Sequence, residues 1–494
     1  MTNSSVAIPR NREAYELLTN EKLQPVLLRG AIIVSMDPDV GDFEQGDVLL
    51  RGGEVVAVGL DLADDYRSAG ATWIDCRGLI LAPGFHDTHR HAWQGQIRRF
   101  LADADLTEYM NTMHFGMAHH YLPEDMYAGS LVTGLGAIDA GITTVMDFSH
   151  NTRTAAHSDA AIAGWIDSGL RAVHASAAPV DGNWDKHWPQ DLERVADNLP
   201  PSGLVTLRMA LFPQFMNAVP DYVELSAKNV QIARGLGLQI SVDAVVGTES
   251  SETLLRLQRE SGVLGSDLTY IHCTDLTDDA WRVIADTGGT ISLSPSSDAH
   301  IGLGTGVTPV QKCIDHGVAP TLSADIESEL PTDMFTQMRT VLALQRMYVY
   351  QARLQNENRS PQLLSSTDAL AMATINGARA NGLGDVCGSI SPGKQADIIA
   401  IRTDDVNMFP LTHVYGAIVQ GADSRNIEFV LIAGRPVKWQ RKVTTFDLSE
   451  ANRIAGESRD RVLSAAGFSH GGVFRSSSGL PPTLRLTGET ASVT

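Results

Sequence analysis

Basic clusters and long apolar runs are both scarce in this sequence. Its formal net charge is −20, and no block of Lys and Arg interrupts the acidic background. Nucleic acid and anionic membranes are therefore not expected partners, because both are bound through basic surfaces. No run approaches the roughly 20 apolar residues that span a bilayer, and the first residues lack the pattern of a secretory signal. We expect a cytoplasmic protein.

Cysteine is also rare. The four cysteines, Cys76, Cys273, Cys313 and Cys387, show no CxxC spacing. They predict reduced thiols, not a disulfide or zinc-finger framework. Hydrophobic residues make up 43% of the chain and charged residues 19%, as in globular proteins. At 494 residues, the chain is too long for one ordinary core and suits a large barrel with a smaller domain.

The order of apolar runs predicts the fold. Between residues 26 and 74, short β-like runs alternate with glycine turns, which is typical of a small antiparallel sheet. Later strand-like runs alternate with helix-like segments, which predicts right-handed βαβ units closed into a barrel. The eight strand candidates are residues 79–89, 141–149, 170–177, 204–212, 238–246, 268–273, 290–297 and 319–325.

We therefore expect an α/β fold: a (β/α)₈ TIM-like barrel and a small composite β-sandwich domain built from both chain ends. The expected boundaries are residues 1–82 and 386–450 for the two parts of the β domain, 83–385 for the barrel and 451–494 for a C-terminal extension. The extension could pack on the barrel or form an oligomer contact. A homodimer or a higher homo-oligomer is the expected assembly.

Three histidines lie close together at the end of the first barrel strand, in PGFHDTHRH (83–91). Side chains alternate along an extended strand, so His89 and His91 face one way and His86 faces the other. Two imidazoles on one face at a strand end can bind one metal ion. Surface histidines also occur at this spacing, so the tripeptide alone leaves both interpretations open.

Three further strand candidates end in groups that bind metals or protons. Asp243 closes strand five, His272 closes strand six and Asp325 closes strand eight. Active sites of such barrels lie at the C-terminal ends of the strands. Each residue alone could be a helix cap, a core histidine or a turn residue, but their coincidence favours a site.

Six segments carry a resemblance to a known family: PGFHDTHRH (83–91), GITTVMDF (141–148), IHC (271–273), LSPSSDAHIGLGTGVTPV (293–310), LSAD (322–325) and ATINGARANGLGDVCGSISPGKQADIIAI (373–401). With these segments the chain resembles the amidohydrolase superfamily, in the branch of cytosine deaminase, guanine deaminase and the triazine hydrolases (chlorohydrolases). The resemblance extends from about residue 26 to about residue 440.

The resemblance implies one divalent metal ion between His89, His91, a strand-five residue and Asp325. Asp325 would also act as general base towards a metal-bound water, and His272 would polarise the substrate. Zn²⁺ is the ion expected first, with Fe²⁺ and Mn²⁺ as alternatives. Such an ion lowers the pKa of bound water towards 7.

Strand five departs from the family pattern of a histidine followed, three residues later, by a glutamate. Here Asp243 stands at the histidine and Val246 at the glutamate, and valine cannot transfer a proton. Asp243 could be a metal ligand, an acid or base replacing the glutamate, or part of a weak metal site with non-hydrolytic chemistry. We favour the ligand, which would give a two-His, two-Asp set more hospitable to Mn²⁺ or Fe²⁺.

Loops beyond the strand ends are expected to bind the substrate. Trp93 and Gln94 follow the histidine pair directly. Later segments also combine histidines with aromatic residues, and they contain His114, Trp184 and His300. Packing of loops onto the barrel accounts equally well for either tryptophan.

The expected function is that of a metal-dependent hydrolase, of the deaminase or amidohydrolase type. A metal-bound hydroxide would attack a C–N or C–halogen carbon of a small nitrogen heterocycle. The missing glutamate makes ordinary purine or pyrimidine deamination less expected, and favours triazine-type chemistry or a specialised metabolite. The alternatives are a lyase, cyclase or decarboxylase that uses the same pocket, and a non-enzymatic relative.

Overall fold

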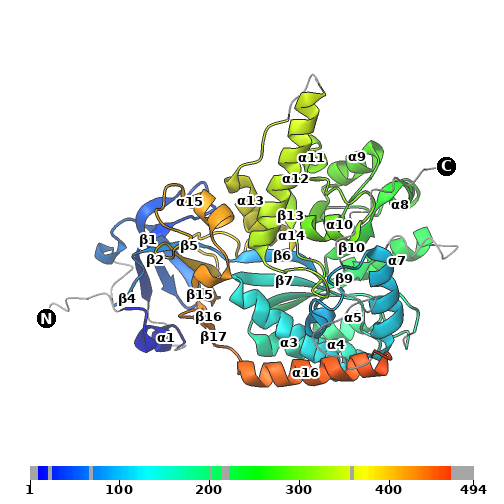
Figure 1. The fold of residues 1–494 in the computed structure, drawn as a ribbon, viewed down its shortest axis with the longest axis horizontal. Helices are drawn as coiled ribbons and strands as arrows, with labels where there is room; N and C mark the ends of the chain where they lie inside the picture. The colour runs from blue at the N-terminus through cyan, green and yellow to red at the C-terminus, as the bar shows by residue number, and fades with distance from the viewer. Residues whose placement is uncertain are drawn as a thin grey trace, which may run out of the picture.

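The structure is a computed structural model. It describes residues 9–19, 25–65, 70–183, 185–200, 203–212, 222–355 and 361–468. In these ranges an eight-stranded sheet and a nine-stranded sheet organise the chain. Figure 1 shows the two sheets side by side, with helices around the eight-stranded one.

The eight-stranded sheet has the strand order β13-β12-β11-β10-β9-β8-β7-β6, and its pairings are parallel. Its two edges meet where Arg90 bridges Asp325. The Asp325 amide donates to the His89 carbonyl at 3.0 Å, and the His91 amide donates to the Asp325 carbonyl at 3.0 Å. The predicted barrel is therefore confirmed. Its strands are β6 (Phe85–Arg90), β7 (Ile142–Ser149), β8 (Arg171–Ser176), β9 (Val205–Leu211), β10 (Ile240–Val245), β11 (Leu268–His272), β12 (Thr290–Leu293) and β13 (Pro320–Leu322).

Two predicted strands differ from those observed. The run 79–89 forms two strands, because the chain passes from one sheet to the other at Gly84. A Cβ at Gly84 would lie 2.2 Å from the Thr143 side chain, so only glycine allows this close approach. The run 290–297 ends as a strand at Leu293, because Pro295 begins helix α10 (Pro295–Ile301).

The nine-stranded sheet joins the two ends of the chain, because β5 pairs antiparallel with β14. The expectation of an antiparallel sheet over residues 26–74 is wrong in part. β1 pairs antiparallel with β2 but parallel with β4 and β5, because the chain crosses over before each of them. The strands are β1 (Val26–Ile33), β2 (Phe43–Arg51), β3 (Glu54–Gly59), β4 (Thr72–Asp75), β5 (Leu79–Pro83), β14 (Ile398–Arg402), β15 (Ile427–Ile432), β16 (Arg435–Trp439) and β17 (Lys442–Val443).

Helices surround the barrel and link the two sheets. In the described ranges, none is long and apolar enough to cross a membrane. The longer helices are α1 (Arg12–Thr19), α3 (Pro123–Asp139), α4 (Ala155–Ser168), α5 (Asp191–Asn198), α7 (Tyr222–Gly235), α8 (Gly247–Ser261), α9 (Asp278–Thr287), α12 (Met334–Leu354), α13 (Ser366–Ala373) and α16 (Leu448–Ala465). The short ones are η1 (Leu62–Asp64), η3 (Ala92–Ile97), α2 (Leu106–Tyr109), η4 (Met110–Met117), η5 (Ala118–His120), α11 (Val310–Asp315), α14 (Ile375–Ala380), α15 (Val414–Gly416), η6 (Ala417–Gly421) and η7 (Ser424–Asn426).

The last described helix packs on the barrel. Helix α16 lies along α3 (Figure 1), and the Ser458 hydroxyl donates to the Asp125 carboxylate at 2.7 Å. Val462 is buried in the same contact region. The first part of the predicted extension therefore covers a barrel helix. Residues 469–494 lie outside the described ranges.

Candidate metal centre

Four predicted ligands converge at the C-terminal ends of strands β6 and β10 and in the loop after β13. The distance from His89 Nε2 to Asp325 Oδ1 is 3.1 Å, and that from His91 Nε2 to the same oxygen is 3.3 Å. Across the barrel, Asp243 lies 3.6 Å from His89 Nε2 and 3.7 Å from His91 Nε2. All four side chains are buried. The barrel therefore brings together residues from three separate parts of the sequence.

His272 completes the cluster from the end of β11. Its Nε2 atom lies 3.2 Å from Asp243 and 3.9 Å from Asp325. On the other side of the ring, Nδ1 donates to the Asp298 carboxylate at 2.7 Å. Asp298 therefore fixes the orientation of the His272 ring.

The donor set fits a divalent cation. His89 Nε2 and Asp325 Oδ1 are buried, and within the described ranges neither forms a well-directed hydrogen bond. Two triads, His89 with His91 and Asp243, and His89 with His272 and Asp325, keep their candidate ligand atoms within 4.8 Å of one another. Imidazole and carboxylate ligands are those that bind zinc and other divalent ions in proteins. A cation between them would compensate the two buried carboxylates and the unpaired imidazole nitrogen.

The carboxylates of the cluster remain charged in spite of their burial. Desolvation opposes the charge on Asp243, but His89 and His272 outweigh it and lower its pKa to about 2. Burial also opposes the charge on Asp325, yet the His89 and His91 rings beside it hold its pKa well below the usual value. Conversely, Asp243 and Asp298 overcome the burial of His272 and raise its pKa well above normal.

His150 forms a second layer behind His91. The His91 Nδ1 atom donates to the Phe148 carbonyl at 3.3 Å and lies 3.0 Å from His150 Nε2. This contact leaves His91 Nε2 free to bind a metal ion. Trp93 donates its indole N–H to His150 at 3.3 Å. Burial lowers the pKa of His150 well below its usual value, so the ring is neutral.

Three strand ends at the centre adopt left-handed backbone conformations. Ala244 has φ 55°, His272 has φ 70° and Asp325 has φ 63°. Residues with side chains rarely adopt this region, and such conformations occur preferentially at functional sites. The backbone turns sharply here, and the strands end with their side chains at the barrel mouth.

The predicted substrate residues are distributed differently. Trp93 and Gln94 are buried, and Gln94 donates to the Tyr109 hydroxyl at 2.6 Å. The His114 ring stacks on His150, with 4.9 Å between the ring centroids. These three lie beside the cluster, and their binding of substrate remains a prediction.

The other two predicted substrate residues are His300 and Trp184. His300 is partly exposed, and its Nε2 atom contacts the Ala102 carbonyl at 3.0 Å. Trp184 lies outside the described residues. The prediction that these two bind substrate also remains.

Three residues at the mouth were not predicted from the sequence. Tyr109 follows no regular pattern, and Glu329 lies in the loop after β13. His150 does follow a strand end, in the segment FSH, so the rule that identified His272 could have found it.

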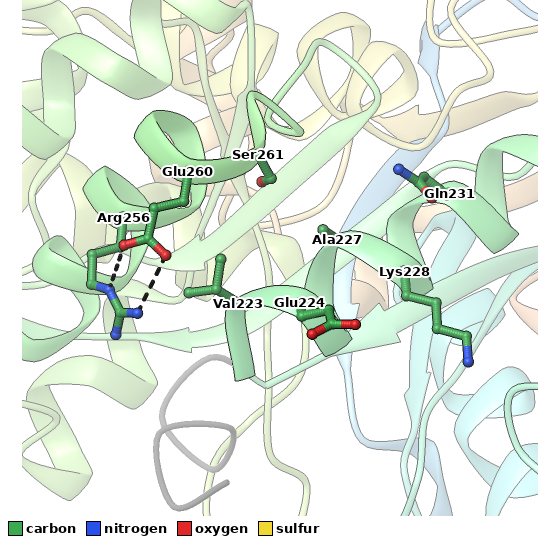
Figure 2. Close-up of a pocket in the computed structure, with 8 residues that line it drawn as sticks. All are labelled: Val223, Glu224, Ala227, Lys228, Gln231, Arg256, Glu260 and Ser261. Atoms are coloured by element: carbon green, nitrogen blue, oxygen red, sulfur yellow. Dashed lines mark hydrogen bonds and ion pairs between the residues drawn. The ribbon is translucent and has the colours of Figure 1, made fainter. Parts of the chain in front are cut away.

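A separate surface cavity of about 590 Å³ lies between α7 and α8 (Figure 2). Its lining includes Lys228, Arg256 and Glu260, and Arg256 Nε donates to Glu260 at 3.0 Å. None of the residues that line it belongs to the predicted site. We therefore place the chemistry at the barrel mouth.

The closed parallel barrel and the His/Asp cluster at its strand ends define the class of barrel hydrolases with a metal centre. The sequence pattern of the amidohydrolase family matches residues 80–437. The chain therefore belongs to the amidohydrolase family, and this confirms the resemblance seen in its motifs.

Relatives of similar length support this assignment. A 5'-deoxyadenosine deaminase of Methanosarcina mazei is 27% identical over 463 residues, which cover 89% of this chain and 99% of the relative. An adenosine deaminase from Xanthomonas campestris, solved with bound zinc, superposes with a TM-score of 0.76 at 22% identity, covering 89% and 98%. An atrazine chlorohydrolase from Arthrobacter aurescens, complexed with zinc, gives 0.72 at 22% identity, covering 88% and 100%. The expected enzyme class, a hydrolase acting on carbon–nitrogen bonds, is confirmed.

Proposed function

We propose that this enzyme hydrolytically deaminates an aminated purine nucleoside, with one divalent ion, Zn²⁺ first, held by His89, His91, Asp243 and Asp325. The convergence of these four buried side chains at one barrel mouth carries the proposal. The relative from Methanosarcina mazei, named as a 5'-deoxyadenosine deaminase, suggests the first substrate to test.

The residues of the cluster have distinct tasks in this reaction. A bound divalent ion would supply a water of lowered pKa and polarise the substrate. The Asp325 carboxylate, 3.1 Å from His89 Nε2, accepts the proton of the attacking water. The His272 ring, held by Asp298, donates a hydrogen bond to the substrate atom on which negative charge develops.

The experiment is ammonia release from 5'-deoxyadenosine by zinc-loaded enzyme, followed in H₂¹⁸O. We expect one ¹⁸O atom in the product for each ammonia released. Asp325→Asn should lower kcat by at least about 100-fold, because proton transfer by a positioned base contributes about 10²–10⁴-fold. Asp279→Asn, which changes a carboxylate exposed on α9, is the matched control. Ammonia release without ¹⁸O would support a lyase instead.

A chlorinated triazine is the second candidate substrate. Val246 removes the acid expected on strand five, and a chloride ion leaves a ring carbon without taking up a proton. The likeness in fold to the atrazine chlorohydrolase is consistent with this choice. Chloride release from atrazine, measured with the same zinc-loaded enzyme, tests it.

A further inference from the structure

Glu329 is a buried carboxyl group in the loop that follows Asp325. Its side chain is fully buried, and the residue as a whole is 4% exposed. Within the described ranges, neither carboxylate oxygen accepts a hydrogen bond. The His300 Nε2 atom lies 3.9 Å from one of the carboxylate oxygens. A buried polar group without a partner is costly, so its retention calls for a reason.

Glu327, two residues earlier, shows what a structural carboxylate looks like in the same loop. It is equally buried, but Arg90 donates to it at 3.0 Å and Arg98 at 2.5 Å. Both of its oxygens therefore have cationic partners. Glu329 has none of these contacts. A role in holding the loop in place therefore does not explain why this carboxyl group is buried.

The loop that carries Glu329 adjoins the predicted metal and substrate residues. Asp325, four residues earlier, donates its amide to the His89 carbonyl at 3.0 Å. The preceding residue, Ser328, donates its hydroxyl to Gln94 at 3.2 Å. Gln94 in turn donates to Tyr109 at 2.6 Å. Glu329 therefore belongs to the wall that carries the predicted substrate residue Gln94.

Glu329 keeps its proton at neutral pH. Burial is the main cause, and the negative charges of Asp325, Glu108 and Asp105 add to it, so that its pKa rises to about 8. The His300 ring is the basic side chain that faces it. A carboxyl group with a pKa near the working pH is suited to general acid catalysis.

We propose that Glu329 is the general acid that protonates the departing amine, the task for which strand five offers only Val246. The inference rests on the proposed deamination. Water adds its hydroxyl to the ring carbon and gives its other proton to Asp325. The carbon–nitrogen bond then breaks, and the amine leaves with the bonding electrons and the Glu329 proton as ammonia. Afterwards the proton on Asp325 passes to solvent, and Glu329 regains one from solvent.

The test compares two leaving groups, because an amine needs a proton to depart and chloride does not. The probes are 5'-deoxyadenosine and its 6-chloro counterpart. Glu329→Gln should lower kcat on the amine at least about 100-fold, and on the chloride less than about threefold. Glu252→Gln, at an exposed position of α8, is the matched control and should change neither.

The two ways of failing are distinguishable. Equal losses on both probes would show that Glu329 only binds or positions the substrate, and would overturn the acid role alone. A zinc-loaded wild type that converts neither probe would overturn the proposed function and, with it, this inference. Retained zinc content in Glu329→Gln shows that the metal centre is intact, and Glu329→Asp, which keeps an acid, should recover part of the activity on the amine.

A second measurement needs no substrate. An ordinary glutamate has a pKa near 4.5, and Glu329 in the folded protein has one of about 8. Between these values only the folded state holds the proton, so the stability of wild type falls as pH rises. Glu329→Gln lacks this loss, and its Tm advantage over wild type should grow from pH 5 to pH 8. A constant difference would show that Glu329 is already ionised and would overturn the proposal.

Discussion

At the scale of single residues, the centre depends on Asp243. Its carboxylate lies 3.6 Å from His89 and 3.2 Å from His272, and it occupies the position where a histidine is usual in the family. A carboxylate is shorter than an imidazole but carries a full negative charge. It can therefore bind the same cation and offset part of the positive charge of that cation.

Removing this carboxylate should weaken metal binding. We expect Asp243→Ala to raise the Kd for Zn²⁺ by at least about 100-fold, since even partners behind a metal ligand contribute about 10–100-fold. Competition with a chromophoric chelator measures this. Asp243→His should bind Zn²⁺ at least as tightly as wild type, because imidazole is a favoured zinc ligand. Equal metal affinity of wild type and Asp243→Ala would show that Asp243 is not a ligand.

Most residues of the cluster could be predicted from the sequence because they close or follow an expected strand, whereas Glu329 could not. His89, His91, Asp243 and His272 each close or follow an apolar run, so alternation and barrel topology place them together. Alternation also separates His86, whose ring lies 3.6 Å from the Cys387 sulfur, away from the cluster. Glu329 follows no periodic pattern, and only the three-dimensional path of its loop buries it.

At the scale of elements, the strand ends of the barrel bear conformational strain. Near the end of strand β10, Ala244 has φ 55° just after Asp243, and Gly247 at φ 72° begins α8. The left-handed region costs a residue with a Cβ roughly 1–2 kcal/mol. Both residues have a left-handed backbone and only one of them is glycine, so the two positions form a matched pair.

Exchanging the residue types at these two positions should have opposite effects on stability. Ala244→Gly should raise the free energy of unfolding by about 0.5–1 kcal/mol, because strain is relieved at the cost of some chain entropy. Gly247→Ala should lower it by about 1 kcal/mol, although no atom lies within 4 Å of the added Cβ. Urea unfolding measures both. A loss of stability in Ala244→Gly would mean that the alanine methyl contributes packing that outweighs the strain.

The sequence predicted the kinds of elements better than their limits. Eight apolar runs gave the eight barrel strands, because each must be buried between its neighbours and the outer helices. The sequence did not predict that residues 79–89 divide between two sheets, because apolar residues lie on both sides of Gly84. The parallel pairing of β1 with β4 and β5 depends on crossovers, which local patterns do not encode.

At the scale of the whole molecule, one buried ion pair joins the barrel to the nine-stranded sheet. Arg171, at the start of β8, donates to both carboxylate oxygens of Asp397, at 2.9 and 3.0 Å. Asp397 also accepts from the Ala433 amide at 2.7 Å, and its carbonyl accepts from Gly84 at 3.0 Å. This junction lies at the N-terminal ends of the barrel strands, opposite the end that carries the metal centre.

Breaking the junction should destabilise the protein without changing its chemistry. Arg171→Met leaves the buried Asp397 carboxylate without its cation, and this should cost about 3–5 kcal/mol. The control is Arg234→Met, which removes an equally bidentate pair with Asp267 from a half-exposed position and should cost less than about 1 kcal/mol. Chemical unfolding measures both costs. Below its unfolding transition, Arg171→Met should keep the kcat and zinc content of wild type, because β8 contributes no ligand. A large fall in kcat at full zinc loading would show instead that the nine-stranded sheet influences the geometry of the barrel mouth through this pair.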